Sequence, residues 1–150
     1  MVNPQSTLII DSSGGNLFIG SSGGPVKAET SGGSIKILQA RGFIEADTSG
    51  GKIEAEMIID DKNVDTHVNL DSSGGSITLH IPKSLAASVS ATLKITRSAR
   101  RDYRIYSDFP LTIKGENSSK ITAKGDINDG GDKITLSTTN GDIHIKMLEE

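Results

Sequence analysis

The feature that most constrains this chain is a glycine that recurs every nine residues near its N-terminus. These glycines are Gly15, Gly24, Gly33, Gly42 and Gly51. Apolar residues follow each glycine at the second and fourth positions, as Ile35 and Ile37 follow Gly33. One further apolar pair, Leu8 and Ile10, extends the register toward the start of the chain without its own glycine. Six copies in phase predict a repeat protein, in which near-identical units stack on one another.

Each repeat unit is predicted to be a short β-strand followed by a tight turn. Apolar side chains two positions apart, with polar ones between them, are typical of a strand that buries one face. In the segment from Ser34 to Ile37, the two isoleucines should point to one side and Ser34 and Lys36 to the other. Recurring glycines disfavour a helix. We expect glycine at the turns because a tight turn needs positive φ, which a Cβ atom penalises.

Alternate units resemble each other more than neighbouring units do, which predicts a coil made of two units. The corners that begin at Asp11, Glu29 and Asp47 match at a spacing of two units. Stacked coils would place such residues in neighbouring parallel strands about 4.8 Å apart, in two sheets about 10 Å apart. The predicted fold is all-β, a parallel β-solenoid of the single-stranded β-helix type with about 18 residues in each two-strand coil. We expect the coil to be right-handed.

The chain of 150 residues is predicted to form a single β-solenoid domain. Regular repeats span residues 8–57, an inserted loop spans 58–70, and irregular coils occupy 71–150. Gly51 and Gly75 are separated by one coil plus six residues, which indicates an insertion into an otherwise continuous stack. A meander of hairpins is the competing fold, but it gives no reason for matching corners at every second turn.

Composition excludes several classes of function. The chain has no cysteine, so neither a disulfide nor a cysteine-ligated metal can hold it together. Its net charge of −3 provides no general attraction to nucleic acid, which we therefore disfavour as a partner. No apolar run is long enough to span a bilayer, so no transmembrane segment is expected in this chain. The start of the chain lacks the pattern of a secretory signal.

The sequence resembles the bacterial "putative adhesin" family of β-strand-repeat domains, a family of unknown function. Four segments carry the resemblance: TSGGSIKI, TSGGKIEAE, SSGGSITLHIP and the closing INDGGDKITLSTTNGDIHIKM. It implies a parallel solenoid-like domain that is usually exported, and it supplies no catalytic residues. It also implies a location at the cell envelope or outside the cell. A signal or anchor is absent from this chain, and a cytoplasmic location stays open.

Acidic residues at equivalent corners predict a ladder along the stack. Its members are Asp11, Glu29, Asp47 and Asp71. Like charges about 5 Å apart repel, and a divalent cation would relieve that repulsion. The alternative is that each carboxylate caps its own turn and is screened by water, as is common for corner acids. We favour capping, and we predict no metal and no cofactor.

Candidate surface contacts form two groups. The first is a charged segment that contains Arg97, Arg100, Arg101, Tyr103 and Arg104. Such a segment could dock a polyanion such as acidic polysaccharide or lipid head groups, but it is also typical of a solvated turn. The second group is Phe18 and Phe43, which neighbour inward-facing residues and should point outward, where they could contact a partner or a second copy.

No catalytic constellation is recognised in the sequence. His67, His80 and His144 are isolated, and His80 and His144 should face away from the core. The serines before Gly-Gly lack the Gly-x-Ser-x-Gly context of a nucleophile, and no phosphate-binding loop is present. The calcium-binding nonapeptide motif also fails, because isoleucine stands where it requires glycine and aspartate.

We therefore predict a non-catalytic structural or adhesive module of the bacterial cell envelope that acts through repeated surface contacts. Its expected partner is a surface protein or a polysaccharide. One alternative is a polysaccharide-acting β-helix enzyme, which would need grouped carboxylates and aromatic platforms for sugar rings. Another is a self-polymerising scaffold, since the open ends of a solenoid could support self-association.

Overall fold

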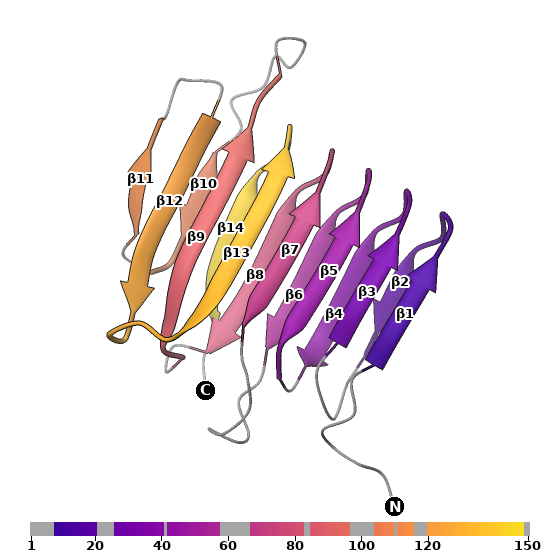
Figure 1. Cartoon of the computed structure of the whole chain (residues 1–150), viewed down its shortest axis with the longest axis horizontal. Coiled ribbons are helices and arrows are strands. Elements are labelled where there is room, and N and C mark those ends of the chain that lie inside the picture. Colours follow the sequence, from indigo (N-terminus) through magenta and orange to yellow (C-terminus); the bar gives the residue numbers. More distant parts are fainter. Residues whose placement is uncertain are drawn as a thin grey trace, which may run out of the picture.

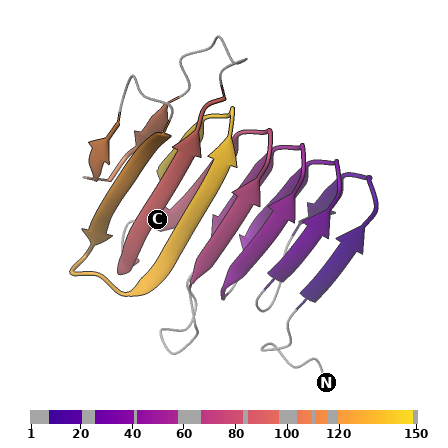
Figure 2. The ribbon, with the colours of Figure 1, turned by 45° about the horizontal axis from the view of Figure 1, so that its top comes forward.

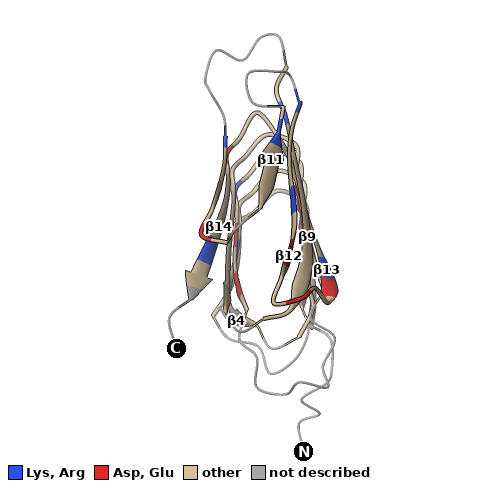
Figure 3. Ribbon diagram, turned by 90° about the vertical axis from the view of Figure 1, so that its left-hand side faces the viewer, with Lys and Arg blue, Asp and Glu red and all other residues tan. Residues whose placement is uncertain are grey.

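The computed structural model describes residues 8–20, 26–40, 42–57, 67–82, 85–96, 104–109, 111–115 and 120–148. This part of the chain contains β-strands and no helix. Its strands form two sheets that face each other, as the view along the sheets shows (Figure 3). A layer of buried apolar side chains lies between them. The prediction of an all-β fold with parallel strands is confirmed.

Successive strands of the N-terminal half alternate between the two sheets (Figures 1 and 2). In spatial order, sheet A contains β1 (Leu8–Ser12), β3 (Val26–Thr30), β5 (Ile44–Thr48), β7 (Val68–Ser72), β13 (Asp132–Thr139), β9 (Ala87–Lys94), β12 (Lys120–Ile127) and β11 (Thr112–Lys114). In the same way, sheet B contains β10 (Ile105–Ser107), β14 (Ile143–Leu148), β8 (Ile77–Pro82), β6 (Ile53–Met57), β4 (Ile35–Ala40) and β2 (Leu17–Ile19).

Strand pairing follows the predicted spacing of two repeat units from β1 to β6. Leu17 pairs with Ile35, and Ile35 pairs with Ile53, all in parallel strands of sheet B. Side chains alternate as expected, because Ile35 and Ile37 are fully buried and Lys36 between them is exposed. We call one strand of sheet A, together with the strand of sheet B that follows it in the chain, a layer. The inward side chains of successive layers therefore form one interior column.

The insertion lengthens one step of this stack without breaking it. Ile44 pairs with Val68 and Ile53 with Ile77. Paired residues are therefore further apart in the sequence at this step than at the earlier steps. β7 begins at Val68, inside the range 58–70 that was expected to be loop. Residues 58–66 of that predicted loop lie outside the described part of the chain.

The C-terminal strands do not stack in the order of the sequence. β13 lies between β7 and β9, and β14 lies between β8 and β10 (Figures 1 and 2). After β8 the chain therefore skips the place of one layer, and its C-terminal pair of strands later fills that place. β12 pairs antiparallel with β9 and with β11, which extends sheet A beyond the last strand of sheet B. A stack that follows the sequence is found only from β1 to β8.

Corner glycines let neighbouring layers approach closely. A Cβ atom on Gly33 would lie 2.2 Å from the carbonyl oxygen of Gly15, and one on Gly51 would lie 2.1 Å from that of Gly33. The same close approach recurs at Gly75 and Gly141. We expected glycine at these corners because of positive φ, and this expectation is wrong, since none of these four glycines has a positive φ. The described glycines with positive φ are Gly42, Gly115 and Gly130.

These contacts also explain why the C-terminal pair fills the skipped layer. Gly141 meets the carbonyl oxygen of Gly75, and the Thr138 hydroxyl donates a hydrogen bond to the same oxygen. The β13–β14 corner thus repeats the contacts that earlier layers make. The sequence between β9 and β10, residues 95–104, contains no glycine that would permit such an approach.

Candidate functional site

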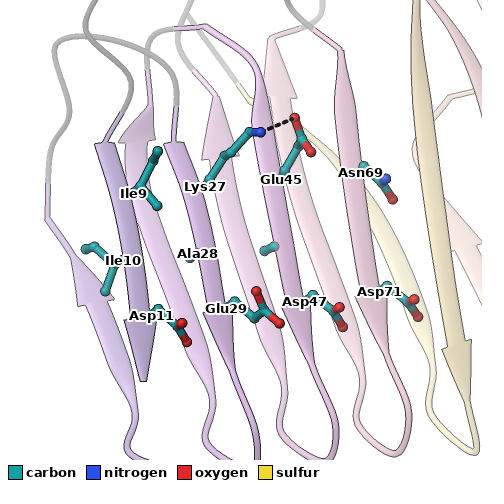
Figure 4. Close-up of a pocket in the computed structure, with 11 residues that line it drawn as sticks. Ile9, Ile10, Asp11, Lys27, Ala28, Glu29, Glu45, Asp47, Asn69 and Asp71 are labelled. Atoms are coloured by element: carbon teal, nitrogen blue, oxygen red, sulfur yellow. Dashed lines mark ion pairs between the residues drawn. The ribbon is translucent and has the colours of Figure 1, made fainter. Parts of the chain in front are cut away.

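The four corner acids lie in one row on the outer face of sheet A. Strand register places Asp11 beside Glu29 and Glu29 beside Asp47. It also places Asp47 beside Asp71, and all four side chains are exposed. Figure 4 shows each carboxyl group on its own strand, along a shallow depression of about 380 Å³. The repeat thus brings together carboxylates that are distant in the sequence.

At the corners of Asp11, Asp47 and Asp71, the turn is capped by the hydroxyl residue that follows the acid. Thr48 Oγ1 accepts a hydrogen bond from the Gly51 N–H at 3.3 Å and donates one to the Gly33 carbonyl at 2.7 Å. Ser72 Oγ accepts from the Gly75 N–H at 2.9 Å and donates to the Gly51 carbonyl at 2.8 Å. Strand alternation buries these hydroxyls and turns the preceding acids outward. The expectation that the acids cap their own turns is therefore not met in the described residues.

The acidic row carries negative charge that no ion pair among the described side chains neutralises. Its carboxylates make no hydrogen bond or ion pair with another described side chain, whereas Glu45 in the next row lies 3.9 Å from Lys27 Nζ. Burial, and then the Asp47 carboxylate, raise the pKa of Asp71, while Lys94 lowers it. No group of three or more side chains in the described ranges could hold a metal ion. The row is an open anionic surface.

The opposite half of the same face carries a group of lysines that sequence reasoning missed. All are exposed at outward positions of β9, β11, β12 or β13: Lys94, Lys114, Lys120, Lys124 and Lys133. Lys120 and Lys94, for example, are direct partners in the antiparallel pair of β12 and β9. These lysines follow no period in the sequence, so only the strand order reveals the group. Figure 3 views the molecule from this end.

Hydroxyl side chains separate the acidic half of the face from the lysine half. Thr135 and Ser137 of β13 continue the rows that contain Asn69 and Asp71. The same two rows continue on β9 and β12 through Ser90, Thr92 and Thr122. The centre of sheet A therefore presents short polar side chains, with charged side chains of opposite sign toward its two ends.

The two candidate phenylalanines lie on opposite sheets. Phe18 belongs to β2 in sheet B, and 66% of its surface is exposed. Phe43 precedes β5 in sheet A and stacks on His67, with ring centroids 4.6 Å apart. His67 Nε2 lies 3.4 Å from the Glu45 carboxylate. The two phenylalanines thus do not form one contact surface, and the Phe43–His67 pair depends on the register across the insertion.

The arginine segment is largely outside the described part of the chain. Four of its predicted contact residues have no described placement: Arg97, Arg100, Arg101 and Tyr103. Arg104 is exposed beside β10, and its backbone N–H donates to Asp142 Oδ1 at 2.9 Å. Nearby, Tyr106 stacks on His144 with ring centroids 4.8 Å apart. His80 and His144 lie outward between buried neighbours, as the alternation predicted.

No family model and no curated protein match this sequence. Among solved structures, the fold is similar to that of a "putative cell adhesion protein" from Clostridium sporogenes ATCC 15579, with a TM-score of 0.56 and 14% identity. The match covers 97% of this chain and 93% of that one. At this identity the likeness establishes the fold alone, and membership of the adhesin family stays a prediction. The described residues include no helix with the length and apolarity of a membrane span.

Proposed function

We propose that this domain is a non-catalytic adhesive or binding module that acts at the bacterial cell envelope or outside the cell. The observation that carries the proposal is the acidic and hydroxyl rows of sheet A, which repeat at the spacing of neighbouring strands. We interpret the layers from β1 to β8 as an open β-solenoid that holds these rows rigidly. Fold similarity to a protein described as a "putative cell adhesion protein" supports the same role.

A polysaccharide or an extended surface protein suits such a face. Each exposed contact contributes little free energy, about 0–1 kcal/mol for a charged pair. Many equal contacts at about 4.8 Å intervals can act together, because a ligand that is held by one contact meets the next at high effective concentration. Binding through the rows should therefore depend on ligand length more than on any single residue.

A polysaccharide-acting enzyme is the second candidate, and one observation favours it. Asp47 and Asp71 are neighbours, and the raised pKa of Asp71 is what a general acid beside a second carboxylate would need. The open surface around this pair argues against it, since sugar-cleaving sites enclose their substrate in a groove lined by aromatic side chains. The non-catalytic role is therefore the better supported of the two.

The test is a screen of the complete domain against immobilised bacterial polysaccharides, followed by a reducing-end assay on every glycan that binds. We expect binding without product release. The variant Asp47→Asn/Asp71→Asn should bind at least about tenfold more weakly, because it removes neighbouring charges from the row. Glu54→Gln, on the outer face of sheet B, is the matched control and should bind as the parent does. Release of reducing ends that stops in the double variant would establish the enzyme instead.

A further inference from the structure

We propose that two copies of this domain associate face to face through sheet A, with the acidic half of each copy against the lysine half of the other. This partner goes beyond the adhesive role proposed above and does not depend on which ligand the domain binds.

The outward positions of sheet A are segregated by charge. Its first four strands carry five carboxylates and one lysine, which gives −4: Asp11, Glu29, Glu45, Asp47, Asp71 and Lys27. Its other four strands carry five lysines and one carboxylate, which gives +4: Lys94, Lys114, Lys120, Lys124, Lys133 and Asp126. Asp132, the first residue of β13, is exposed at an inward register position and is not counted. The chain as a whole has a net charge of only −3, so composition conceals this separation.

A two-fold axis can place the acidic half of each copy against the lysine half of the other. The axis would lie between the copies, parallel to the strands and above the boundary between β7 and β13, with four strands on either side. β7 would then face β13 of the second copy, and β5, β3 and β1 would face β9, β12 and β11. With the rows kept in register, Asp11 would face Lys114, Asp47 would face Thr92 next to Lys94, and Glu29 would face Thr122 between Lys120 and Lys124. Lys27 would face Lys124, a like-charge contact within the otherwise opposite halves. One contact repeated twice is how most homodimers are built.

The face is also large enough for a stable dimer. Eight strands at about 4.8 Å spacing span roughly 34 Å, and all of them except the three-residue β11 contain five to eight residues, which makes them roughly 17–27 Å long. The resulting area, roughly 600–900 Å² per copy, is that of a standard interface between two proteins. Short hydroxyl side chains occupy its centre, where Ser137 and Thr92 are half-buried, so the centres of two faces can approach closely.

A second copy accounts for both halves of the face. A polyanion would bind the lysine half and be repelled by the acidic half, and a cationic ligand would do the reverse. Two copies in the opposite orientation would set acids against acids, so repulsion selects one arrangement. Individual exposed ion pairs are weak and are screened by salt, so the dimer should form at low ionic strength and dissociate at high ionic strength.

The experiment is sedimentation velocity on the complete domain over a concentration series, at about 20 mM and about 500 mM salt. We expect a monomer–dimer equilibrium whose dissociation constant rises about tenfold or more with salt. Glu29→Lys/Asp47→Lys alone and Lys94→Glu/Lys124→Glu alone should be monomeric, and an equimolar mixture of the two variants should form a mixed dimer. Lys36→Glu/Glu54→Lys on sheet B is the matched control and should dimerise like the parent.

Three results would overturn the proposal. The parent could remain monomeric at low salt, or its dimer could be unaffected by salt and by the sheet A reversals. The sheet B control could also abolish the dimer as strongly as the sheet A variants. Circular dichroism of every variant separates lost association from lost folding. Variants that fail to fold would be replaced by the neutral changes Asp47→Asn and Lys124→Gln, for which we expect weaker dimers.

Discussion

At the scale of single residues, the two glycines of each corner have different tasks. The first glycine has free space around it, since a Cβ atom on Gly50 would have no neighbouring atom within 4 Å. The second lies against the layer before it, where a Cβ atom on Gly51 would lie 2.1 Å from the Gly33 carbonyl oxygen. In the sequence the second glycine is kept at two corners that lack the first, because Arg41 precedes Gly42 and Asn140 precedes Gly141. Contact with the neighbouring layer explains this difference at Gly51 and Gly141.

This difference predicts opposite outcomes for two identical substitutions. Gly51→Ala should lower the free energy of unfolding by roughly 2–3 kcal/mol, because the layers must separate to admit the methyl group. Gly50→Ala should leave it unchanged or raise it by up to about 1 kcal/mol, because alanine restricts the unfolded chain. Urea denaturation followed by circular dichroism measures both. Equal effects of the two substitutions would contradict the close approach between layers.

The acidic row predicts a pH dependence of stability. Burial and the Asp47 carboxylate raise the pKa of Asp71 above its ordinary value of 3.8, so the folded state holds this proton more tightly than the unfolded state. The protonated Asp71 side chain therefore stabilises the folded state below pH 3.8, and this stabilisation is lost as the pH rises through the raised pKa of Asp71. Asp71→Asn should have a higher urea midpoint than the parent at pH 7, and this advantage should shrink toward pH 4.

Glu54→Gln on sheet B serves as the control for removing a half-buried carboxylate from the other sheet. A lower urea midpoint for Asp71→Asn at pH 7 would mean that attraction to Lys94 outweighs burial and repulsion by Asp47.

At the scale of elements, β13 is central although it lies near the end of the chain. It pairs with β7 on one side and β9 on the other, and Leu136 is fully buried between Leu70 and Ala91. β1, by contrast, is an edge strand, and its Ile10 is only partly buried. Position in the sheet, rather than position in the sequence, sets how much each strand contributes to stability.

Truncation of the two side chains tests this ranking. Leu136→Ala should cost about 2–5 kcal/mol, because the cavity lies between two paired strands and cannot collapse. Ile10→Ala should cost clearly less, since the site is open at the end of the stack. Urea denaturation of both variants provides the comparison. A cost for Ile10→Ala as large as that for Leu136→Ala would show that the first layer is covered.

At the scale of the whole molecule, the interleaved C-terminal pair changes the expected unfolding behaviour. A simple solenoid can lose layers from either end, because each layer contacts only its neighbours. Here β13 and β14 lie between the β7–β8 layer and the β9–β10 layer, both of which come much earlier in the sequence, so layers on both sides of them depend on the C-terminus. Loss of order should therefore begin at β1 and β2.

Native-state hydrogen exchange tests this order. Amides of β13 from Ile134 to Thr138 should be among the slowest to exchange, and those of β1 and β2 should exchange faster, through local opening. Two-dimensional NMR of the labelled domain in D₂O would rank them. Slow exchange in β1 together with fast exchange in β13 would contradict the strand order.

Local pattern was enough to predict much of the fold and part of the candidate site. The spacing of two repeat units predicted that Leu17, Ile35 and Ile53 would share a column, and the pairing confirms it. The same spacing placed the corner acids in one row. It could not assign the capping hydroxyls, because Thr48 and its preceding acid are both common turn formers. Alternation into the core, which decides between them, depends on the packed sheets.

The repeat alone determined that this protein stacks parallel strands in two sheets, because side-chain alternation and corner chemistry act over a few residues. Tertiary structure decided which layers are neighbours in the C-terminal half. Several layers present similar edges to an incoming strand, and the match is settled by contacts between distant parts of the sequence, such as Gly141 against Gly75. The lysine half of sheet A depends on that choice, since β13 and β9 and then β9 and β12 are neighbours in the sheet but not consecutive in the sequence.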